Sequence, residues 1–397
     1  MSFNIATSGL NAITQQLNAI SNNIANSGTT GYKSMRAEFA SLYAGSNPLG
    51  VGVTNVSQSI SSGGNIASTG RSLDLAINGN GFFVVRDSNG STTYTRAGYF
   101  GTDSNGYLVN NAGGKLQGYP VDASGNLQTG TVGDLQINAS GLPAKATSTI
   151  DFAANLDARE EAKAADNVFN PDDSSTFNKS YTTQVYDSLG REHTVTQYFV
   201  KTGENEWTAH YVVDGDKENS SSQELTFDTN GQLASPTGAV SINATISGAE
   251  PLELKMSYAG SSQYGSDFSV TTNKADGYKS GERTGQQIDE DGMVYATYSN
   301  GQRLLQGQMV LANFTNPDGL SAIDGTAWEQ TNSSGAPLLG TPKSGMYGQI
   351  TAAALESSNV DLTTELVGLM SAQRNYQANT KVISTNDQMM NSLFQAL

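Results

Sequence analysis

The two ends of the chain carry apolar residues at the alternating spacing of three and four that is typical of helices packed against other helices. Near the start, this row comprises Phe3, Ala6, Leu10, Ile13, Leu17, Ile20 and Ile24. Near the end, it comprises Leu362, Leu366, Leu369, Tyr376, Ile383, Met390, Phe394 and Leu397, with polar interruptions at Gln373, Thr380 and Asp387. Polar positions in such a row weaken helix pairing but fix its register. We therefore predict one assembly helix at each end.

Glycine positions and local patterns predict the segments that follow the first helix. Residues 3–26 are predicted to be helical, and Gly28 and Gly31 then suit a left-handed helix cap. A second, short helix is predicted at 35–43. Residues 51–71 are rich in Ser, Gly and Asn without periodicity, so we expect an extended connector that becomes ordered only against neighbouring elements.

The middle of the chain shows short apolar runs separated by a recurrent Asp-x-x-Gly pattern. It occurs at 87–90, 103–106, 122–125, 187–190, 228–231 and 289–292. Asp at the first position accepts a backbone hydrogen bond and Gly at the fourth tolerates a positive φ, so each is predicted to be a type I turn. The alternative is a calcium-binding loop, whose clustered acidic ligands only residues 289–292 approach.

Alternating polar and apolar residues over 182–213 predict a β-hairpin whose strands are joined at 201–205. Polar or Gly-rich stretches at 157–173 and 260–281 bracket it and suggest an inserted domain. We predict a mostly β, α+β fold in which the terminal helices form a coiled-coil-like assembly domain beside two β-rich domains nested by insertion. The predicted parts are residues 1–71 with 357–397 (helices and connector), 72–144 with 286–356 (inner β-domain) and 145–285 (outer β-domain).

Composition excludes several classes of function. The formal net charge of −16, with only 21 Lys and Arg, disfavours binding to nucleic acid or to an anionic membrane, both of which are negative. The chain has no cysteine, so it can form neither disulfides nor thiolate metal sites. The sequence has no apolar run near the roughly 20 residues of a membrane-spanning helix. The first 32 residues hold no Lys or Arg, so we expect no basic secretory leader and a non-classical export route.

Residues suited to catalysis are sparse. His193 and His210 lie on the two strands of the predicted hairpin, where a metal or acid–base role is the alternative to a place in an ordinary sheet face. The acidic pairs at 160–161 and 172–173 match the two carboxylates of a glycosidase only if they face one cleft, and their loop-like surroundings favour a solvated surface. We therefore predict no catalytic, cofactor-binding or metal-binding residues.

One long segment runs from Leu17 to Lys33 and includes Asn22-Asn23-Ile24-Ala25-Asn26. Further segments of the same kind lie at residues 80–83, 94–100, 358–362, 365–367 and 372–379. Together these segments resemble those of bacterial flagellar rod and hook proteins. The resemblance covers both ends and the inner β-domain closely, and the outer insert only loosely.

The resemblance implies a structural role outside the cell. Rod subunits lack a full outer domain, so the length of this chain favours the hook-forming members, and the distal rod is the alternative. A secreted β-rich adhesin or carbohydrate-active enzyme is the alternative from another class. The resemblance implies a flexible, curved homopolymer that transmits torque from rod to filament, and a place in the flagellar hook attached to the basal body. Its polymerisation residues would be Leu10, Ile13, Leu17, Ile20, Ile24, Leu362, Leu366, Leu369, Tyr376, Ile383 and Met390.

The same resemblance implies particular partners. These are further copies of the chain, the hook cap, the distal rod and the hook–filament junction proteins, with neither nucleic acid nor membrane insertion. It also implies export through the flagellar type III apparatus. Residues 39–43 resemble a short aromatic export motif, with Phe39 and Tyr43 as its aromatic ends, although Tyr43 stands where the motif has Phe. The alternative for this segment is an amphipathic turn packed on its neighbour.

Overall fold

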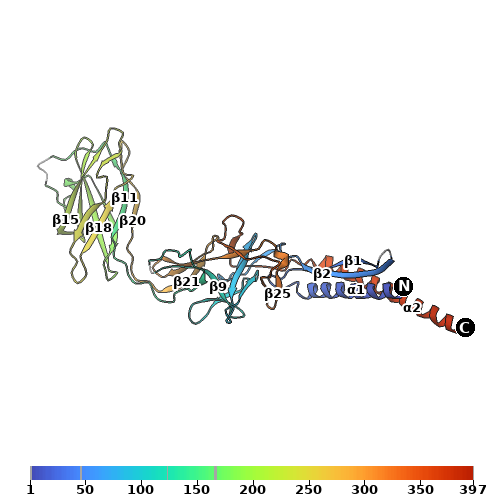
Figure 1. Ribbon diagram of the computed structural model, residues 1–397. Helices are drawn as coiled ribbons and strands as arrows, with labels where there is room; N and C mark the ends of the chain where they lie inside the picture. Colours follow the sequence, from blue (N-terminus) through green and yellow to red (C-terminus); the bar gives the residue numbers. More distant parts are fainter. Residues whose placement is uncertain (1, 45–46, 123, 165–167, 397) are drawn as a thin grey trace. The chain divides into compact units, whose positions relative to one another are not determined.

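The computed structural model describes residues 2–44, 47–122, 124–164 and 168–396. The chain forms two compact units (Figure 1). Unit 1 comprises Met1–Ala139, Gly285–Thr297 and Arg303–Leu397. Unit 2 comprises Ser140–Thr284 and Tyr298–Gln302. The finer division into three nested domains remains a prediction.

The described residues contain two α-helices, one near each end, and are otherwise mostly β-strands, which confirms the predicted fold class. Helix α1 spans Ser2–Ala25 and helix α2 spans Leu362–Ala396. Within the described part of the chain, neither helix combines the length and apolar character needed to cross a membrane. Both helices belong to unit 1 and pack against each other beside a β-hairpin (Figure 1).

That hairpin corrects two predictions. It consists of β1 (Met35–Ala44) and β2 (Asn47–Gln58), so the short helix predicted at 35–43 is wrong. Its ladder runs from the pair Met35 and Gln58 to the pair Ala44 and Asn47. Residues 35–43 form a strand because the Val-rich second strand supplies a pairing partner, which overrides their weak local preference for a helix. Much of the predicted connector is thus already ordered within a single chain.

The rest of unit 1 is a mixed set of short sheets. The main sheet runs in the order β21-β22-β23-β9-β5-β6-β26-β25, and β7, β8, β10, β24 and β27 pair at its sides. Its strands are β5 (Phe82–Arg86), β6 (Thr92–Thr95), β7 (Phe100–Thr102), β8 (Leu108–Asn110), β9 (Lys115–Pro120), β10 (Gly133–Asp134), β21 (Arg283–Ile288), β22 (Met293–Tyr298), β23 (Arg303–Met309), β24 (Leu311–Asn313), β25 (Ser321–Ile323), β26 (Ala327–Glu329) and β27 (Leu338–Gly340). Two smaller pairs join β4 (Leu75–Asn78) to β28 (Gln349–Ala352) and β3 (Ile66–Ser68) to β29 (Ala354–Glu356). A short 3₁₀ turn spans Pro317–Gly319.

Strands from both halves of the chain meet in this main sheet. Strand β23 pairs with β9, and β24 pairs with β5. The core beneath them is aromatic, with the Phe82 ring edge-on to those of Phe314 and Trp328 at centroid distances of 6.0 and 5.7 Å. Such edge-to-face pairs add specificity to the burial of apolar area. Unit 1 is therefore closed by pairing between segments more than 180 residues apart.

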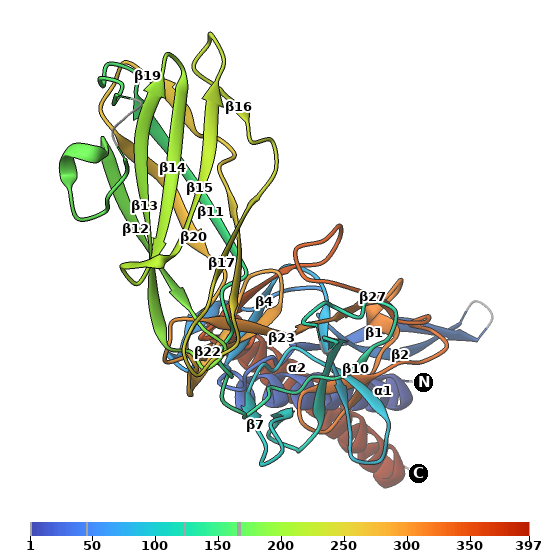
Figure 2. The same ribbon diagram turned by 90° about the vertical axis from the view of Figure 1, so that its left-hand side faces the viewer.

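Unit 2 is a sandwich of two sheets (Figure 2). The first has the order β17-β18-β11-β19, with β20 also on β11, and the second has the order β12-β13-β14-β15-β16. The strands are β11 (Thr149–Asp157), β12 (Lys179–Tyr186), β13 (Glu192–Gly203), β14 (Glu206–Val213), β15 (Asp216–Phe227), β16 (Leu233–Ser235), β17 (Val240–Ala244), β18 (Leu252–Ser257), β19 (Ser262–Tyr264) and β20 (Ser269–Ala275). A 3₁₀ turn spans Ser174–Thr176. Strands β13 and β14 form the predicted hairpin, which is confirmed.

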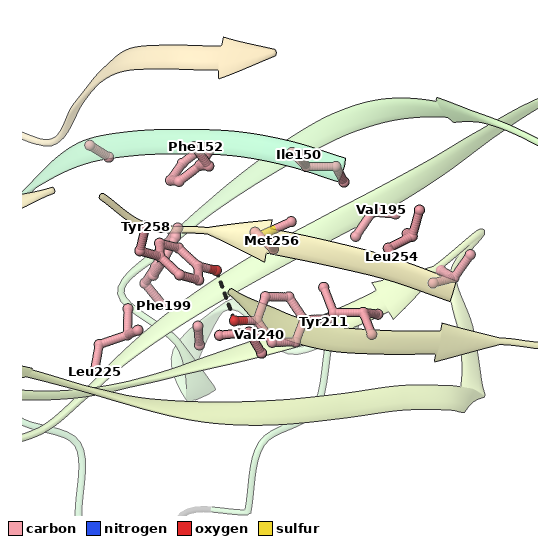
Figure 3. Close-up of a cluster of buried hydrophobic side chains, with 14 of the residues drawn as sticks. Ile150, Phe152, Val195, Phe199, Tyr211, Leu225, Val240, Leu254, Met256 and Tyr258 are labelled. Atoms are coloured by element: carbon pink, nitrogen blue, oxygen red, sulfur yellow. Dashed lines mark hydrogen bonds between the residues drawn. The ribbon is translucent and has the colours of Figure 1, made fainter. Parts of the chain in front are cut away.

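The core of unit 2 fills the space between its two sheets with side chains from both (Figure 3). It contains a small polar network, in which the Tyr258 hydroxyl is hydrogen-bonded to the Tyr211 hydroxyl at 2.9 Å and to Gln197 Oε1 at 2.7 Å. Burial raises the pKa of both tyrosines, so their hydroxyls stay neutral hydrogen-bonding groups. Gln197 and Tyr211 lie in one sheet, and Tyr258 directly follows a strand of the other. These hydrogen bonds therefore fix the position of one sheet relative to the other.

The turns predicted from the Asp-x-x-Gly pattern are confirmed. In every one, the glycine amide donates to the carbonyl of the aspartate three residues earlier, at 2.9–3.1 Å. Each of these glycines has a φ between +76° and +85°. L-residues with a side chain are strained there, which is why glycine ends every turn. The clustered acids at 289–292 form such a turn, and no group of three metal-ligating side chains exists among the described residues.

The two histidines lie on the predicted hairpin but in different surroundings. The ring of His210 stacks on that of Phe169 at 4.1 Å. The ring of His193 lies between two carboxylates, with Nδ1 bonded to Asp214 Oδ2 and Nε2 3.3 Å from Asp187 Oδ2. Burial alone lowers the pKa of His193, but these two carboxylates outweigh it and raise the pKa above its ordinary value. Both histidines therefore serve packing and turn structure.

We expect the free energy of unfolding of unit 2 to fall as pH rises from about 6.5 through the raised pKa of His193. Below that range His193 is charged in both folded and unfolded chains, so the stabilising interaction is fully present; above it, the charge is lost. Urea denaturation followed by Trp207 fluorescence in a Trp328→Phe variant measures this. His193→Gln should remove the dependence, and its persistence there would assign the effect to another group.

Candidate functional site

The terminal helices meet through the apolar row predicted on the first of them. Ile13 and Ile20 are buried against α2, and Leu17 and Ile24 pack beside them. Leu10, on the same row, is half-buried. Most of the predicted row on α1 therefore packs on α2 within one chain, whereas Phe3 at its start is 46% exposed.

On α2, the face that touches α1 overlaps the predicted row only in part. Leu369 is the predicted residue that packs there, next to the fully buried Ala372. Gly368 faces Ile20, where an added Cβ would lie 3.4 Å from Ile20 Cδ1. Small residues let two helices approach closely. Sequence reasoning missed Gly368 and Ala372 because it looked for large apolar side chains.

Most of the predicted α2 row is nevertheless exposed in the single chain. Leu362, Leu366, Tyr376 and Met390 are 41–50% exposed, and Ile383 is half-buried. Leu397 lies outside the described residues, as does the side chain of Phe394. We call the following set of exposed apolar residues on α2 the exposed stripe: Leu362, Leu366, Val367, Met370, Tyr376, Val382, Met389 and Met390. These side chains point in several directions around α2, and so many large apolar groups exposed on one helix favour its burial against other chains.

Asn23, inside the Asn-Asn-Ile-Ala-Asn segment, connects the end of α1 to the start of α2. Its side-chain amide accepts from the Met35 N–H and donates to the Met35 carbonyl, both at 2.8 Å. The same amide donates to Glu365 Oε1 at 2.8 Å, and the Tyr32 hydroxyl donates to Asn23 Oδ1. Asn23 itself is 1% exposed, and its bond with the Tyr32 hydroxyl is buried while the others are partly buried. One buried amide thus fixes the chain's turn from α1 into β1.

A buried ion cluster lies where the segments after α1 meet those before α2, a region that we call the junction. Glu356, the last residue of β29, accepts from Lys33 Nζ at 2.6 Å and from Arg96 Nη1 at 3.1 Å. Glu356 also accepts from the Gly64 amide at 2.9 Å, and Lys33 donates to the Ser62 carbonyl. Lys33, Arg96 and Glu356 are between 1% and 4% exposed. One carboxylate therefore joins four separate segments of unit 1.

The buried cations of this cluster keep their charge because a carboxylate lies beside them. Burial lowers the pKa of Lys33 and of Arg96, while the adjacent Glu356 carboxylate opposes that shift in both. Arg96 further donates to the carbonyls of Ile77 and Gly79. Removing the carboxylate would leave two cations without water or a counter-ion. Glu356 was not among the predicted site residues; its isolation beside apolar Leu355 is the signal that could have revealed it.

The segment before α2 completes the junction. The side chain of Asn359 accepts from the Ser34 amide at 2.8 Å and donates to the carbonyls of Ser59 and Ser62. Asp361 caps α2 through the amides of Thr363 and Thr364, which lower the pKa of its carboxyl. Four of the segments that carry the flagellar resemblance, at 17–33, 94–100, 358–362 and 365–367, thus meet at this junction.

The segment predicted as an export motif lies in β1. Phe39 is 41% and Tyr43 is 63% exposed. On the other strand of the hairpin, the Val51 amide donates to Ser8 Oγ of α1 at 3.2 Å. The segment is therefore part of a strand held against α1, neither a helix nor an isolated turn.

Family comparisons place these features in one class. The description "Flagella basal body rod protein" matches residues 3–33, and "Flagellar basal body rod FlgEFG protein C-terminal" matches 351–396. "Flagellar hook protein FlgE/F/G D1 domain" matches 76–151, and "Flagellar basal body protein FlaE D2 domain" matches 155–278. The helix pair, the junction and the inserted sandwich are thus those of a structural protein of the flagellar rod and hook.

Individual relatives narrow this class. The flagellar hook protein FlgE of Salmonella typhimurium is 43% identical over 99% of both chains, and that of Escherichia coli K12 is 42% identical over the same shares. That of Borreliella burgdorferi is 31% identical over 97% of both chains. The chain belongs to the flagellar hook protein FlgE family, whose place is the hook of the bacterial flagellum. The Helicobacter pylori flagellar hook protein FlgE2 shares the fold, with a TM-score of 0.54 at 15% identity over 73% of this chain and all of that one.

Proposed function

We propose that copies of this chain polymerise into the hook tube, with their terminal helices forming its inner wall. The exposed stripe on α2 carries this proposal. It leaves large apolar side chains in water in the single chain, although the same helix already packs Leu369 and Ala372 on α1. Burying each such side chain contributes about 1.5–3 kcal/mol. A few per copy, repeated along a tube, are enough to hold it together.

The proposed tube transmits torque from rod to filament and bends as it turns. Interlocked helices resist twisting because rotation would separate many apolar contacts. The surface of unit 2 is rich in Ser, Thr and Asn, so contacts between neighbouring copies there can slide without exposing apolar area. This combination supports a stiff inner layer beneath a compliant outer layer.

The proposed partners are those of a hook in assembly. They are further copies of the chain, the hook cap, the distal rod and the hook–filament junction proteins. Export through the flagellar type III apparatus, in the unfolded state, is part of the proposal, with Phe39 and Tyr43 as candidate recognition residues. No catalytic or cofactor-dependent step belongs to this function.

Electron microscopy of cells with a gold-detectable tag at Gly238 tests the proposal. Gly238 is exposed in a turn of unit 2, and no heavy atom lies within 4 Å of its added Cβ. Label along a short curved tube between cell surface and filament is the expected result. Label confined to the rod would favour the distal-rod alternative, and label dispersed in the medium would favour a secreted adhesin or carbohydrate-active enzyme.

A further inference from the structure

Three of the chain's nine methionines lie on helix α2, within the exposed stripe. Met370, Met389 and Met390 are 59%, 61% and 47% exposed. Met256 and Met309, in the cores of the two units, are by contrast fully buried. The methionine side chains of α2 are therefore open to small solutes in the single chain.

Met370 lies on the side of α2 that is turned away from α1. It stands two residues after Gly368 and two before Ala372, which both face α1. A step of two residues turns a helix by about 200°, so the Met370 side chain points nearly the opposite way. Leu366, four residues earlier, is 50% exposed and is its neighbour on the helix surface. The thioether thus lies beside another exposed apolar side chain.

Met389 and Met390 lie beyond the end of α1. Gly9 of α1 faces Asn379 of α2. Helix α1 begins about seven residues before Gly9, and since the two helices are antiparallel it covers α2 for only about seven residues past Asn379. Helix α2 itself continues to Ala396, and its last turns extend past the start of α1 (Figure 1). The chain therefore offers these two methionines no cover from α1.

Methionine is the side chain that a peroxide attacks first in this chain. The chain has no cysteine, and its two tryptophans, Trp207 and Trp328, are 1% and 2% exposed. Hydrogen peroxide transfers one oxygen atom to the methionine sulfur: an S–O bond forms, the O–O bond breaks, and water leaves. The sulfur is oxidised by two electrons to the sulfoxide, and the peroxide is reduced.

Oxidation changes what the methionines of α2 can do in a contact. Unoxidised methionine is flexible and apolar, and suits surfaces whose packing changes, as contacts inside a bending tube must. The sulfoxide is polar, and its oxygen accepts hydrogen bonds. Between apolar side chains that oxygen would be buried without a donor, which is unfavourable. The same side chains therefore favour assembly when reduced and oppose it when oxidised.

We propose that Met370, Met389 and Met390 form an oxidation site at which peroxide blocks assembly of the single chain, and that the assembled tube protects them. The inference rests on the proposed polymerisation, because burial between copies is what closes the site. The reaction is reversible, since methionine sulfoxide reductases return both sulfoxide epimers to methionine. Oxidation thus acts on copies that have not yet joined a tube.

Oxidation of purified single chains tests the site. Chains are treated with hydrogen peroxide, the peroxide is removed, and peptide mass spectrometry locates the added oxygen atoms. We expect the three α2 methionines to be oxidised before Met256 and Met309. The concentration needed for tube formation should then rise roughly tenfold or more, because burial of apolar side chains is lost. Chains oxidised at all three positions that form tubes at the unchanged concentration would overturn the proposal.

Leucine variants separate α2 from the rest of the chain. Leucine has a volume similar to that of methionine and cannot be oxidised by peroxide, so the triple variant Met370→Leu, Met389→Leu and Met390→Leu should form tubes equally well before and after treatment. Met346→Leu is the matched control, because Met346 is 56% exposed in a turn of unit 1. Its assembly should remain sensitive. A triple variant as sensitive as the unmodified chain would place the effect elsewhere.

Reductase treatment needs no substitution. Methionine sulfoxide reductases should restore tube formation to oxidised, unmodified chains. Chains that still form no tubes after mass spectrometry shows their sulfoxides reduced would contradict the proposal, whatever the triple variant does.

Protection is measured on tubes that are already formed. The same peroxide treatment should leave their α2 methionines unoxidised, and oxidation there as fast as in single chains would overturn the protected site. Failure of the unmodified, untreated chain to form tubes would instead refute the proposed function on which this inference rests.

Discussion

Glu356→Gln is expected to lower the free energy of unfolding of unit 1 by about 3–5 kcal/mol, the cost of leaving buried charges without their partner. The substitution keeps the shape of the side chain but removes the one carboxylate that Lys33 and Arg96 share. Urea denaturation monitored by hydrogen exchange measures the effect. Exchange is quantified separately for peptides of unit 1 and peptides of unit 2. Unit 2 should unfold as before.

Two further variants separate charge from shape. The cluster holds two cations and one carboxylate, a formal charge of +1, which Glu356→Gln raises to +2. Adding Lys33→Met returns it to +1, so the double variant should recover part of the lost stability. Glu290→Gln is the surface control, because the ion pair of Glu290 with Lys343 is exposed and screened by water, so its loss is expected to change stability little. Equal losses from Glu290→Gln and Glu356→Gln would show that the cluster does not hold the junction.

Leu366→Asp is expected to abolish tube formation while leaving the single chain folded. Leu366 is 50% exposed on α2, so the charged side chain meets water in the single chain and stability should change by no more than about 0.5 kcal/mol. In a tube, the carboxylate would be buried against a neighbouring copy without a partner. Electron microscopy of purified chains and a motility assay of cells measure the result.

The control for this variant lies one heptad further along the same helix. Gln373 is exposed and polar, so Gln373→Asp adds the same charge without removing an apolar contact. Its tubes should form. Tubes of normal length from Leu366→Asp would remove the exposed stripe from the proposal, and failure of both variants would point to charge repulsion instead.

Local sequence patterns were sufficient to predict much of the fold. The Asp-x-x-Gly turns were predictable because a side-chain acceptor at the first position and a glycine at the fourth satisfy a turn within four residues. The hairpin of β13 and β14 followed from alternation over neighbouring residues. The first helix was predictable because its apolar spacing matches the helical repeat.

Features that depend on distant partners were not predictable in the same way. Residues 35–43 look weakly helical, and only pairing with β2 makes them a strand. Which face of α2 meets α1 is decided by Gly368 and Ala372, because close approach of two helices favours small residues that carry little apolar signal.

The sequence by itself determined the two terminal helices, the turns, the mostly β middle and, through its resemblance, the family. Each of these depends on residues within a few positions of one another or on a long matching segment. Tertiary structure alone decided that Lys33, Arg96 and Glu356 share one buried site and that most of the apolar row of α2 remains exposed in the single chain. Both results come from contacts between segments hundreds of residues apart, which no local pattern encodes.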